Sequence, residues 1–236
     1  MPKKMTNVDI WVVKEDGHIR KALENASTYF DDKDVLNVNT LEAIYAKESS
    51  FGTKLNNRGI SAAAGEFQLQ KSLAEHYGLY VSKDNDQRFD IDYSSIAAAR
   101  YLKDIDYAFS KRTNLGTKLF TYPIIDPVER EKFDFAAYTG GQGTIGKAQQ
   151  LASKAGKDPT RWDAVKDFLM PSKDISADTI NKIKGYVPRV SEYEAEFAKK
   201  SQADKKAKDK KFIKPKIQCT KGHWITKDHL HIFICK

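Results

Sequence analysis

Residues 44–52 read Ile-Tyr-Ala-Lys-Glu-Ser-Ser-Phe-Gly, and this stretch places an acid on the apolar face of an expected helix. Leu41, Ile44 and Glu48 follow one another at i, i+3 and i+7, which is the spacing of one helical face. Phe51 follows at the helix end, one turn further on. A carboxylate among apolar side chains loses hydration, which raises its pKa and suits it to hold a proton as a general acid. The alternative interpretation is an exposed glutamate at the edge of the helix.

The chain up to about residue 198 carries helical patterns and few strand signals. Asp126, followed by Pro127 and by Glu129, is a strong helix start, with Glu129 expected to complete a capping box. The expected helices cover about residues 18–30, 41–50 after a Thr40 cap, 69–77, the stretch from a Ser94 or Ser95 cap to about 109, 126–138, 144–155, 176–184 and 188–200. The sequence therefore predicts a mainly α domain over residues 1–198, with an N-terminal extension over about residues 1–15.

The last twenty residues alternate like a β-hairpin, which predicts a small C-terminal appendage. With the turn near Lys227, Cys219 lies opposite Cys235 and His223 lies opposite His231, all on one face. A cross-strand disulfide is the favoured interpretation, and two free thiols or a metal site are the alternatives. One zinc ion is disfavoured because each histidine stands four residues from its cysteine, about 13 Å along a strand. A disulfide implies an oxidising compartment outside the cytoplasm.

Three further stretches follow Glu48 in order along the chain. They are Gly65-Glu66-Phe67-Gln68-Leu69, Ala136-Ala137-Tyr138-Thr139-Gly140-Gly141 and Tyr186-Val187-Pro188-Arg189-Val190. With the Glu-Ser-Ser-Phe stretch, they make roughly residues 35–195 resemble the soluble lytic transglycosylases, whose catalytic domain shares a lysozyme-like α fold with goose-type lysozymes. Each motif alone is weak, whereas four motifs in this order form a specific pattern.

The resemblance implies a reaction at Glu48, which matches the catalytic acid/base of that family. In the implied mechanism Glu48 protonates the glycosidic oxygen of peptidoglycan. It then accepts the proton of the muramic acid 6-hydroxyl, which attacks C1 and leaves a 1,6-anhydro end. Ser49 matches a residue that positions the substrate or the catalytic glutamate, and Phe51 matches the family aromatic.

Three more positions take implied roles around the sugar. Gln68 matches the glutamine that lines the cleft, and Tyr138 matches the tyrosine beside the catalytic carboxylate. Tyr186 matches the late tyrosine of the pattern. Outside these motifs, Tyr101 and His76 are interpreted as structural residues of helices.

The sequence also departs from the family pattern. Gly52-Thr53 replaces the usual Asn-Pro, and Thr139 replaces a frequent Asn. Glu66 takes a position between the glycine and the glutamine that is usually apolar. It is either a surface residue, a substrate contact or a second carboxylate, which retaining hydrolysis needs at about 5–5.5 Å from the first.

The net charge of +8 indicates anionic partners, and much of it lies in the stretch Lys199–Lys216, KKSQADKKAKDKKFIKPK. This stretch is interpreted as a solvated linker before the hairpin at residues 217–236, or as an attachment segment for anionic wall polymers. Nucleic acid is disfavoured because no aromatic residues interleave with these lysines. No apolar run is long enough to cross a bilayer, and no signal peptide or cofactor motif is visible.

The sequence thus predicts a periplasmic or secreted enzyme that acts on peptidoglycan glycan strands. The favoured function is a lytic transglycosylase cleaving the β-1,4 bond between N-acetylmuramic acid and N-acetylglucosamine. One alternative is a lysozyme-type muramidase that hydrolyses the same bond with Glu66 as the second carboxylate. Another is a non-catalytic protein that binds peptidoglycan.

Overall fold

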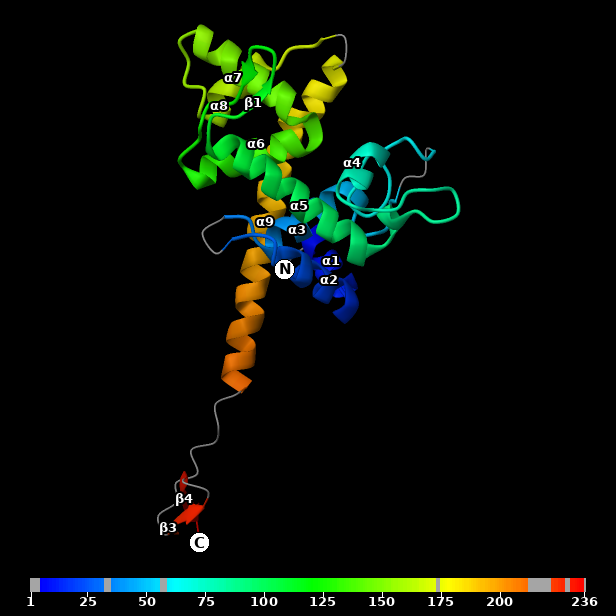
Figure 1. Ribbon diagram of the computed structural model, residues 1–236. Helices are drawn as coiled ribbons and strands as arrows, with labels where there is room; N and C mark the ends of the chain where they lie inside the picture. Colours follow the sequence, from blue (N-terminus) through cyan, green and yellow to red (C-terminus); the bar gives the residue numbers. More distant parts are fainter. Residues whose placement is uncertain are drawn as a thin grey trace. The chain divides into compact units, whose positions relative to one another are not determined.

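Helices make up most of the described part of the chain (Figure 1), as expected for a mainly α protein. In this computed structural model the described residues are 5–31, 35–55, 59–172, 175–211, 222–227 and 230–235. The α-helices are α1 (Asn7–Lys14), α2 (Gly17–Ser27), α3 (Val38–Ser49), α4 (Lys71–His76), α5 (Ile91–Ser110), α6 (Pro127–Gly140), α7 (Gln142–Lys154), α8 (Trp162–Val165) and α9 (Ala177–Lys211). The strands are β1 (Asn114–Gly116), β2 (Leu119–Phe120), β3 (Gly222–Lys227) and β4 (Leu230–Cys235), and single 3-10 turns are η1 (Gln87–Phe89) and η2 (Lys166–Phe168).

Short polar side chains start α3, α5 and α6, although not always the ones predicted. Asp126 caps α6 as expected, because its carboxylate accepts two backbone N–H bonds. Asn37 rather than Thr40 caps α3, and Thr40 closes a capping box from inside the helix. Asp90 rather than Ser94 or Ser95 caps α5. Both helices therefore begin earlier than predicted, α3 by three residues and α5 by four or five.

The predicted capping box at Glu129 is wrong. Glu129 is buried, and its carboxylate accepts the backbone N–H of Trp162 at 3.0 Å. It also forms an ion pair with Lys132 at 2.5 Å. This glutamate therefore ties α6 to the start of α8 instead of satisfying its own helix end.

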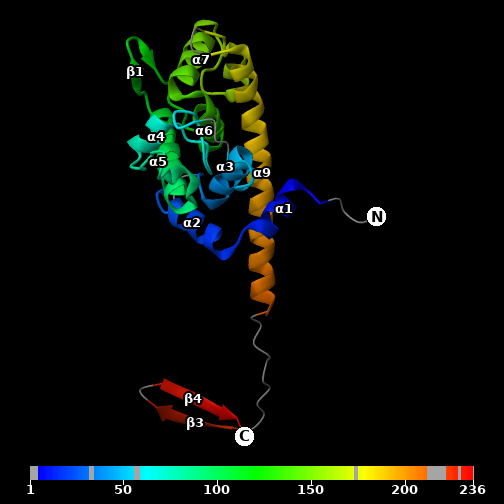
Figure 2. The same ribbon diagram turned by 90° about the vertical axis from the view of Figure 1, so that its right-hand side faces the viewer.

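Helix α5 lies at the centre of the helical domain and contacts α2, α3 and α6. Its alanines at Ala97, Ala98 and Ala99 are fully buried, and small side chains let neighbouring helices approach closely. α6 in turn packs on α7. Figure 2 shows α1 beside α9, where the Trp11 ring meets the edge of Tyr193 at 4.9 Å. The N-terminal extension, for which no helix was predicted, thus contributes to the core through α1.

One helix, α9, replaces the two helices predicted at 176–184 and 188–200 and continues into the predicted linker as far as Lys211. Pro188 lies inside it, although proline removes a helical hydrogen bond at a cost of about 3 kcal/mol. Ile183, Val187 and Val190 are buried on the same helix, and their packing holds the chain helical across the proline. Residues 212–216 of the predicted linker lie outside the described residues.

The chain divides into two compact units, Met1–Ala198 and Lys199–Lys236. In the second unit β3 and β4 pair antiparallel as the predicted hairpin, but the predicted register is wrong. His223 pairs with Ile234 and His231 with Thr226, so the turn falls after Lys227 rather than on it. Cys235 pairs with Gly222, and Cys219 lies outside the described residues, so the disulfide remains a prediction. None of the described helices is long and apolar enough to span a membrane.

Candidate functional site

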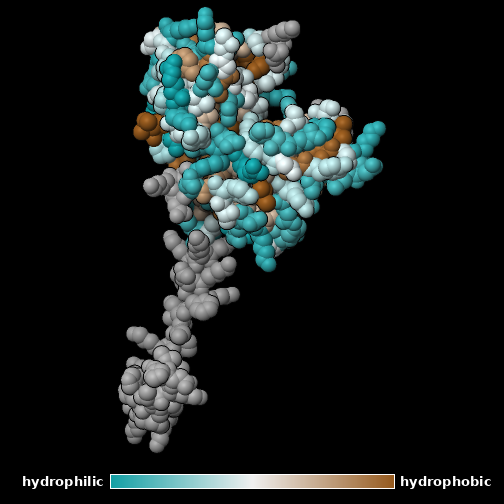
Figure 3. Space-filling model, viewed as in Figure 1, coloured by the Kyte–Doolittle hydropathy of each residue, from teal (hydrophilic) through white to brown (hydrophobic). Residues whose placement is uncertain are grey.

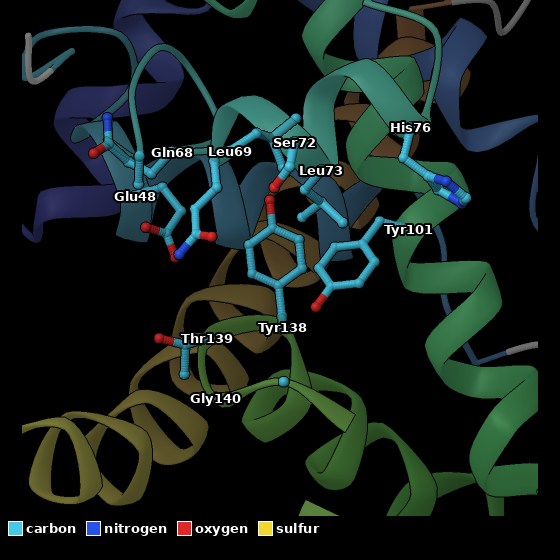
Figure 4. A pocket seen from close by; sticks show the side chains of 13 residues that line it. Glu48, Gln68, Leu69, Ser72, Leu73, His76, Tyr101, Tyr138, Thr139 and Gly140 are labelled. Carbon is cyan, nitrogen blue, oxygen red and sulfur yellow. The ribbon is translucent and has the colours of Figure 1, made fainter. Parts of the chain in front are cut away.

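A cleft of about 600 Å³ opens between the ends of α3 and α6, beside α4, a size typical of ligand sites. The space-filling surface is mainly hydrophilic and is notched between the region of α6 and α7 and the region of α4 (Figure 3). Lining residues that bear on the chemistry are Glu48, Gln68, Ser72, His76, Tyr101 and Tyr138. Figure 4 shows the Glu48 carboxylate pointing into the space from one wall, with Tyr138 and Thr139 rising from the opposite wall.

Glu48 stands one residue before the end of α3, and its side chain is half-buried. Burial raises the pKa of Glu48 from 4.5 to about 7, although the Tyr186 hydroxyl and the charge of Lys47 both lower it. Burial dominates because a carboxylate removed from water loses hydration that these two groups only partly replace. At neutral pH the protonated and ionised forms of Glu48 are therefore both well populated.

Two tyrosines flank this carboxylate. The Tyr138 ring stacks on the Tyr186 ring at 6.5 Å, and the Tyr138 hydroxyl donates to the carbonyl of Phe67 at 3.0 Å. The Tyr186 hydroxyl is buried near Glu48, yet it completes no hydrogen bond of normal distance and angle with the described residues. Burial, and then the charge of Glu48, hold the pKa of both tyrosines well above the usual range. Both phenols therefore stay protonated, with the Tyr138 proton donated to the Phe67 carbonyl and the Tyr186 proton free to reach Glu48.

The chain leaves α3 through an unusual turn. Ser50, Phe51 and Gly52 all have left-handed backbone angles, with φ of 51°, 58° and 73°. The first two lack the freedom of glycine, so this turn is strained. Ser49 stabilises it, because its hydroxyl donates to the Tyr45 carbonyl at 3.1 Å and accepts the Gly52 N–H at 3.0 Å.

Phe51 anchors the same turn from below the cleft. Its ring lies 4.5 Å from Tyr45, 5.9 Å from Phe197 and 6.5 Å from Trp11. These four side chains, which we call the aromatic cluster, are all buried. Ser49 and Phe51 therefore do not line the cleft but shape the turn that ends the helix of Glu48.

Gln68 lines the cleft and also has a left-handed backbone, with φ of 50°. Its amide nitrogen donates to the carbonyls of Leu55 at 3.0 Å and Gly65 at 2.8 Å. The side chain thus closes its own loop at the edge of the cleft.

Glu66 is not among the residues that line the cleft. It is buried beside Tyr45, whose hydroxyl lowers its pKa, while burial has the larger effect and raises the pKa. Glu48 is the only carboxylate among the described residues that line the cleft.

The cleft also contains residues that the sequence did not single out. Tyr101 and His76, interpreted as structural, both line it, and Tyr101 donates to the Ala137 carbonyl at 3.2 Å. Ser72 and His76 follow a spacing of i and i+4 on α4, which is the spacing of one helical face and could be read from the sequence. In the described part of the chain, no three His, Cys, Asp or Glu side chains form a group that could hold a metal ion.

Comparisons with known proteins agree with this geometry. The family described as Transglycosylase SLT domain matches residues 29–160, more than half of the chain. A membrane-bound lytic murein transglycosylase F of Desulfosudis oleivorans is 27% identical over 161 residues, covering 65% of this chain and 31% of that protein. A protein of the same name from Marinobacter nauticus is 27% identical over 155 residues, covering 64% and 27%. The chain thus spans less than a third of the length of these relatives.

Proposed function

This chain belongs to the transglycosylase SLT domain family, and from that premise we propose that it cleaves peptidoglycan glycan strands as a lytic transglycosylase. The family match confirms the resemblance and covers the first three of its four motifs, and the mainly α structure agrees with the lysozyme-like fold that the resemblance implied. The bond cleaved in this proposal is the β-1,4 bond from N-acetylmuramic acid to N-acetylglucosamine.

The observation that carries the proposal is a single carboxylate, Glu48, in the cleft with a pKa near neutrality. In the first step the Glu48 proton passes to the glycosidic oxygen as the bond to C1 breaks. In the second step Glu48 takes the proton of the 6-hydroxyl of the same muramic acid residue, and the 6-oxygen forms a bond to C1. One group serves both steps because the substrate supplies its own nucleophile, so no water enters the product.

The remaining motif residues act on the position and charge of Glu48. The buried Tyr186 hydroxyl lies near the carboxylate and lowers its pKa, so it stabilises the anion after the first proton has left. Ser49 and Phe51 fix the end of α3, and Gln68 and Tyr138 hold the loop of residues 65–68 at the cleft wall. A role for Glu66 as the second carboxylate of a hydrolase is disfavoured by its position outside the cleft lining. We place the site of action at the cell wall, in a periplasmic or secreted protein.

Mass spectrometry of the fragments released from purified peptidoglycan tests this proposal. Transglycosylation gives 1,6-anhydro ends, whereas hydrolysis gives reducing ends heavier by one water. We expect anhydro ends from the unmodified chain and no fragments from Glu48→Gln. Reducing ends would replace the proposal with hydrolysis, and a folded chain that binds peptidoglycan without releasing fragments would leave only a binding function.

A further inference from the structure

One wall of the cleft has little regular structure. Residues 59–69, which we call the cleft loop, contribute Ala63, Gln68 and Leu69 to the lining. Its only pairing of β type is an isolated bridge between Ala64 and Leu69. A loop that carries binding groups but lacks a strand or helix must be held by other contacts if the cleft is to keep its shape.

Arg88 supplies these contacts from beneath the loop. The side chain is 1% exposed. Its guanidinium donates to the carbonyls of Ala62 at 2.6 Å and Leu69 at 3.1 Å, both through Nη1, and to that of Ile60 at 3.0 Å through Nη2. The rigid, planar guanidinium of Arg88 therefore donates hydrogen bonds to three carbonyls that are spread along the cleft loop.

Asp86 completes the set. Its two carboxylate oxygens accept Nε at 2.9 Å and Nη2 at 2.6 Å, which is a bidentate ion pair. All five N–H groups of the arginine then have acceptors. A lysine has three donors on a single atom and cannot reproduce this planar arrangement.

The backbone of Arg88 holds the loop a second time. Its carbonyl accepts the N–H of Glu66 at 2.9 Å. Gly65, with φ of 79°, passes so close that a Cβ there would lie 1.9 Å from the same carbonyl oxygen. Side chain and main chain of one residue thus fix both ends and the middle of the cleft loop, next to the strained backbone of Gln68.

We propose that Arg88, clamped by Asp86, is a positioning residue that sets the shape of the cleft wall formed by the cleft loop beside Glu48. The inference rests on the proposed function for its effect on catalysis, but its structural part stands on the hydrogen bonds alone. In this proposal Arg88 does not contact the glycosidic bond that is cleaved. It acts through the cleft loop, where an error of about 1 Å in substrate position can lower a rate on the order of 100-fold.

Hydrogen exchange of the full chain, measured by mass spectrometry, tests the structural part with Arg88→Lys. We expect amides of the cleft loop to exchange about tenfold faster or more, while amides of α5 keep their rates, because the loop opens locally. Arg161→Lys is the matched control, since Arg161 is exposed and its guanidinium lies 3.6–3.8 Å from two acids that do not line the cleft. Asp86→Asn carries the same test if Arg88→Lys fails to fold.

Kinetics on purified peptidoglycan test the catalytic part. We expect kcat/KM to fall on the order of 10- to 100-fold in Arg88→Lys, with the pH at which activity is half-lost unchanged, because Arg88 has no effect on the pKa of Glu48. The proposal would be overturned if the amides of the cleft loop exchanged at the rates of the unmodified chain. It would also be overturned if their rates rose only together with those of α5. If the unmodified chain releases no fragments, the proposed function fails, and the exchange rates still decide whether Arg88 positions the loop.

Discussion

Replacing Tyr186 by phenylalanine tests the electrostatics of the site through the pH dependence of cleavage. Glu48 must be protonated in the free enzyme to act as an acid, so kcat/KM should decline above the pKa of Glu48, about 7. The Tyr186 hydroxyl lowers that pKa by favouring the anion. Its removal therefore raises the pKa, and the protonated enzyme persists to higher pH.

The size of the effect follows from the balance at Glu48. A rise from 4.5 to about 7 means that the site disfavours the anion by about 3 kcal/mol relative to water. A hydrogen bond to a charged group contributes about 1.5–3 kcal/mol, and the geometry of the Tyr186 hydroxyl is short of ideal, so we take the lower end. The expected pKa of Glu48 in Tyr186→Phe is then about 8.

The assay is the release of soluble fragments from purified peptidoglycan, with kcat/KM measured from about pH 5 to 9. Tyr101→Phe is the matched control, because Tyr101 lines the same cleft but does not affect the pKa of Glu48. Its alkaline limb should stay near pH 7. The reasoning is refuted if Tyr186→Phe is folded and active but its alkaline limb stays near pH 7 or moves to lower pH.

Three other perturbations give separate outcomes. Glu48→Gln should keep its melting temperature by circular dichroism and lose about 1,000-fold or more in fragment release, because an amide cannot donate the proton; turnover within tenfold of the unmodified chain would remove Glu48 from the mechanism. Burial, and then neighbouring carboxyl groups, raise the pKa values of Glu42 and Glu131 to about 8, so the folded state holds more protons than the unfolded state above pH 4.5. The free energy of unfolding in urea should therefore fall between about pH 5 and 8, and Glu42→Gln should flatten that slope; an equally steep slope in the variant would contradict this. Deletion of residues 201–236 should weaken pelleting with insoluble wall in low salt and leave cleavage of short soluble glycans intact; equal loss of both would make the second unit part of the active domain.

Periodicity in the sequence predicted the helix that carries Glu48, while the assignment of Glu48 as the acid came from the family resemblance. The spacing of Leu41, Ile44 and Glu48 indicates which side of the helix is apolar, and burial of that side raises the pKa of Glu48. Helix starts were harder, since Asn37 and Thr40 are both good caps and only tertiary packing selects between them. The predicted register of the hairpin was wrong because an error in the position of the turn shifts every cross-strand pair by the same amount.

The positions of the other motif residues depend on contacts far apart in the sequence. Nothing near Glu66 in the chain indicates that Tyr45 covers it, and Phe51 meets side chains from both ends of the helical domain. The sequence analysis did not single out Arg88, because three of its acceptors are backbone carbonyls, which every residue has. The roles of these residues depend on which distant residues the fold brings into contact with them, and not on residue type.

The aromatic cluster also determines how short an excised catalytic fragment can be. Phe51 rests on Trp11 and Phe197, and both of these lie outside the matched stretch 29–160. A fragment trimmed to that stretch would expose the Phe51 ring to solvent and release the left-handed turn behind the acid. The smallest fragment that keeps this packing therefore runs from before α1 to beyond Phe197. A fusion of the catalytic domain to another protein must include both α1 and the part of α9 that carries Phe197.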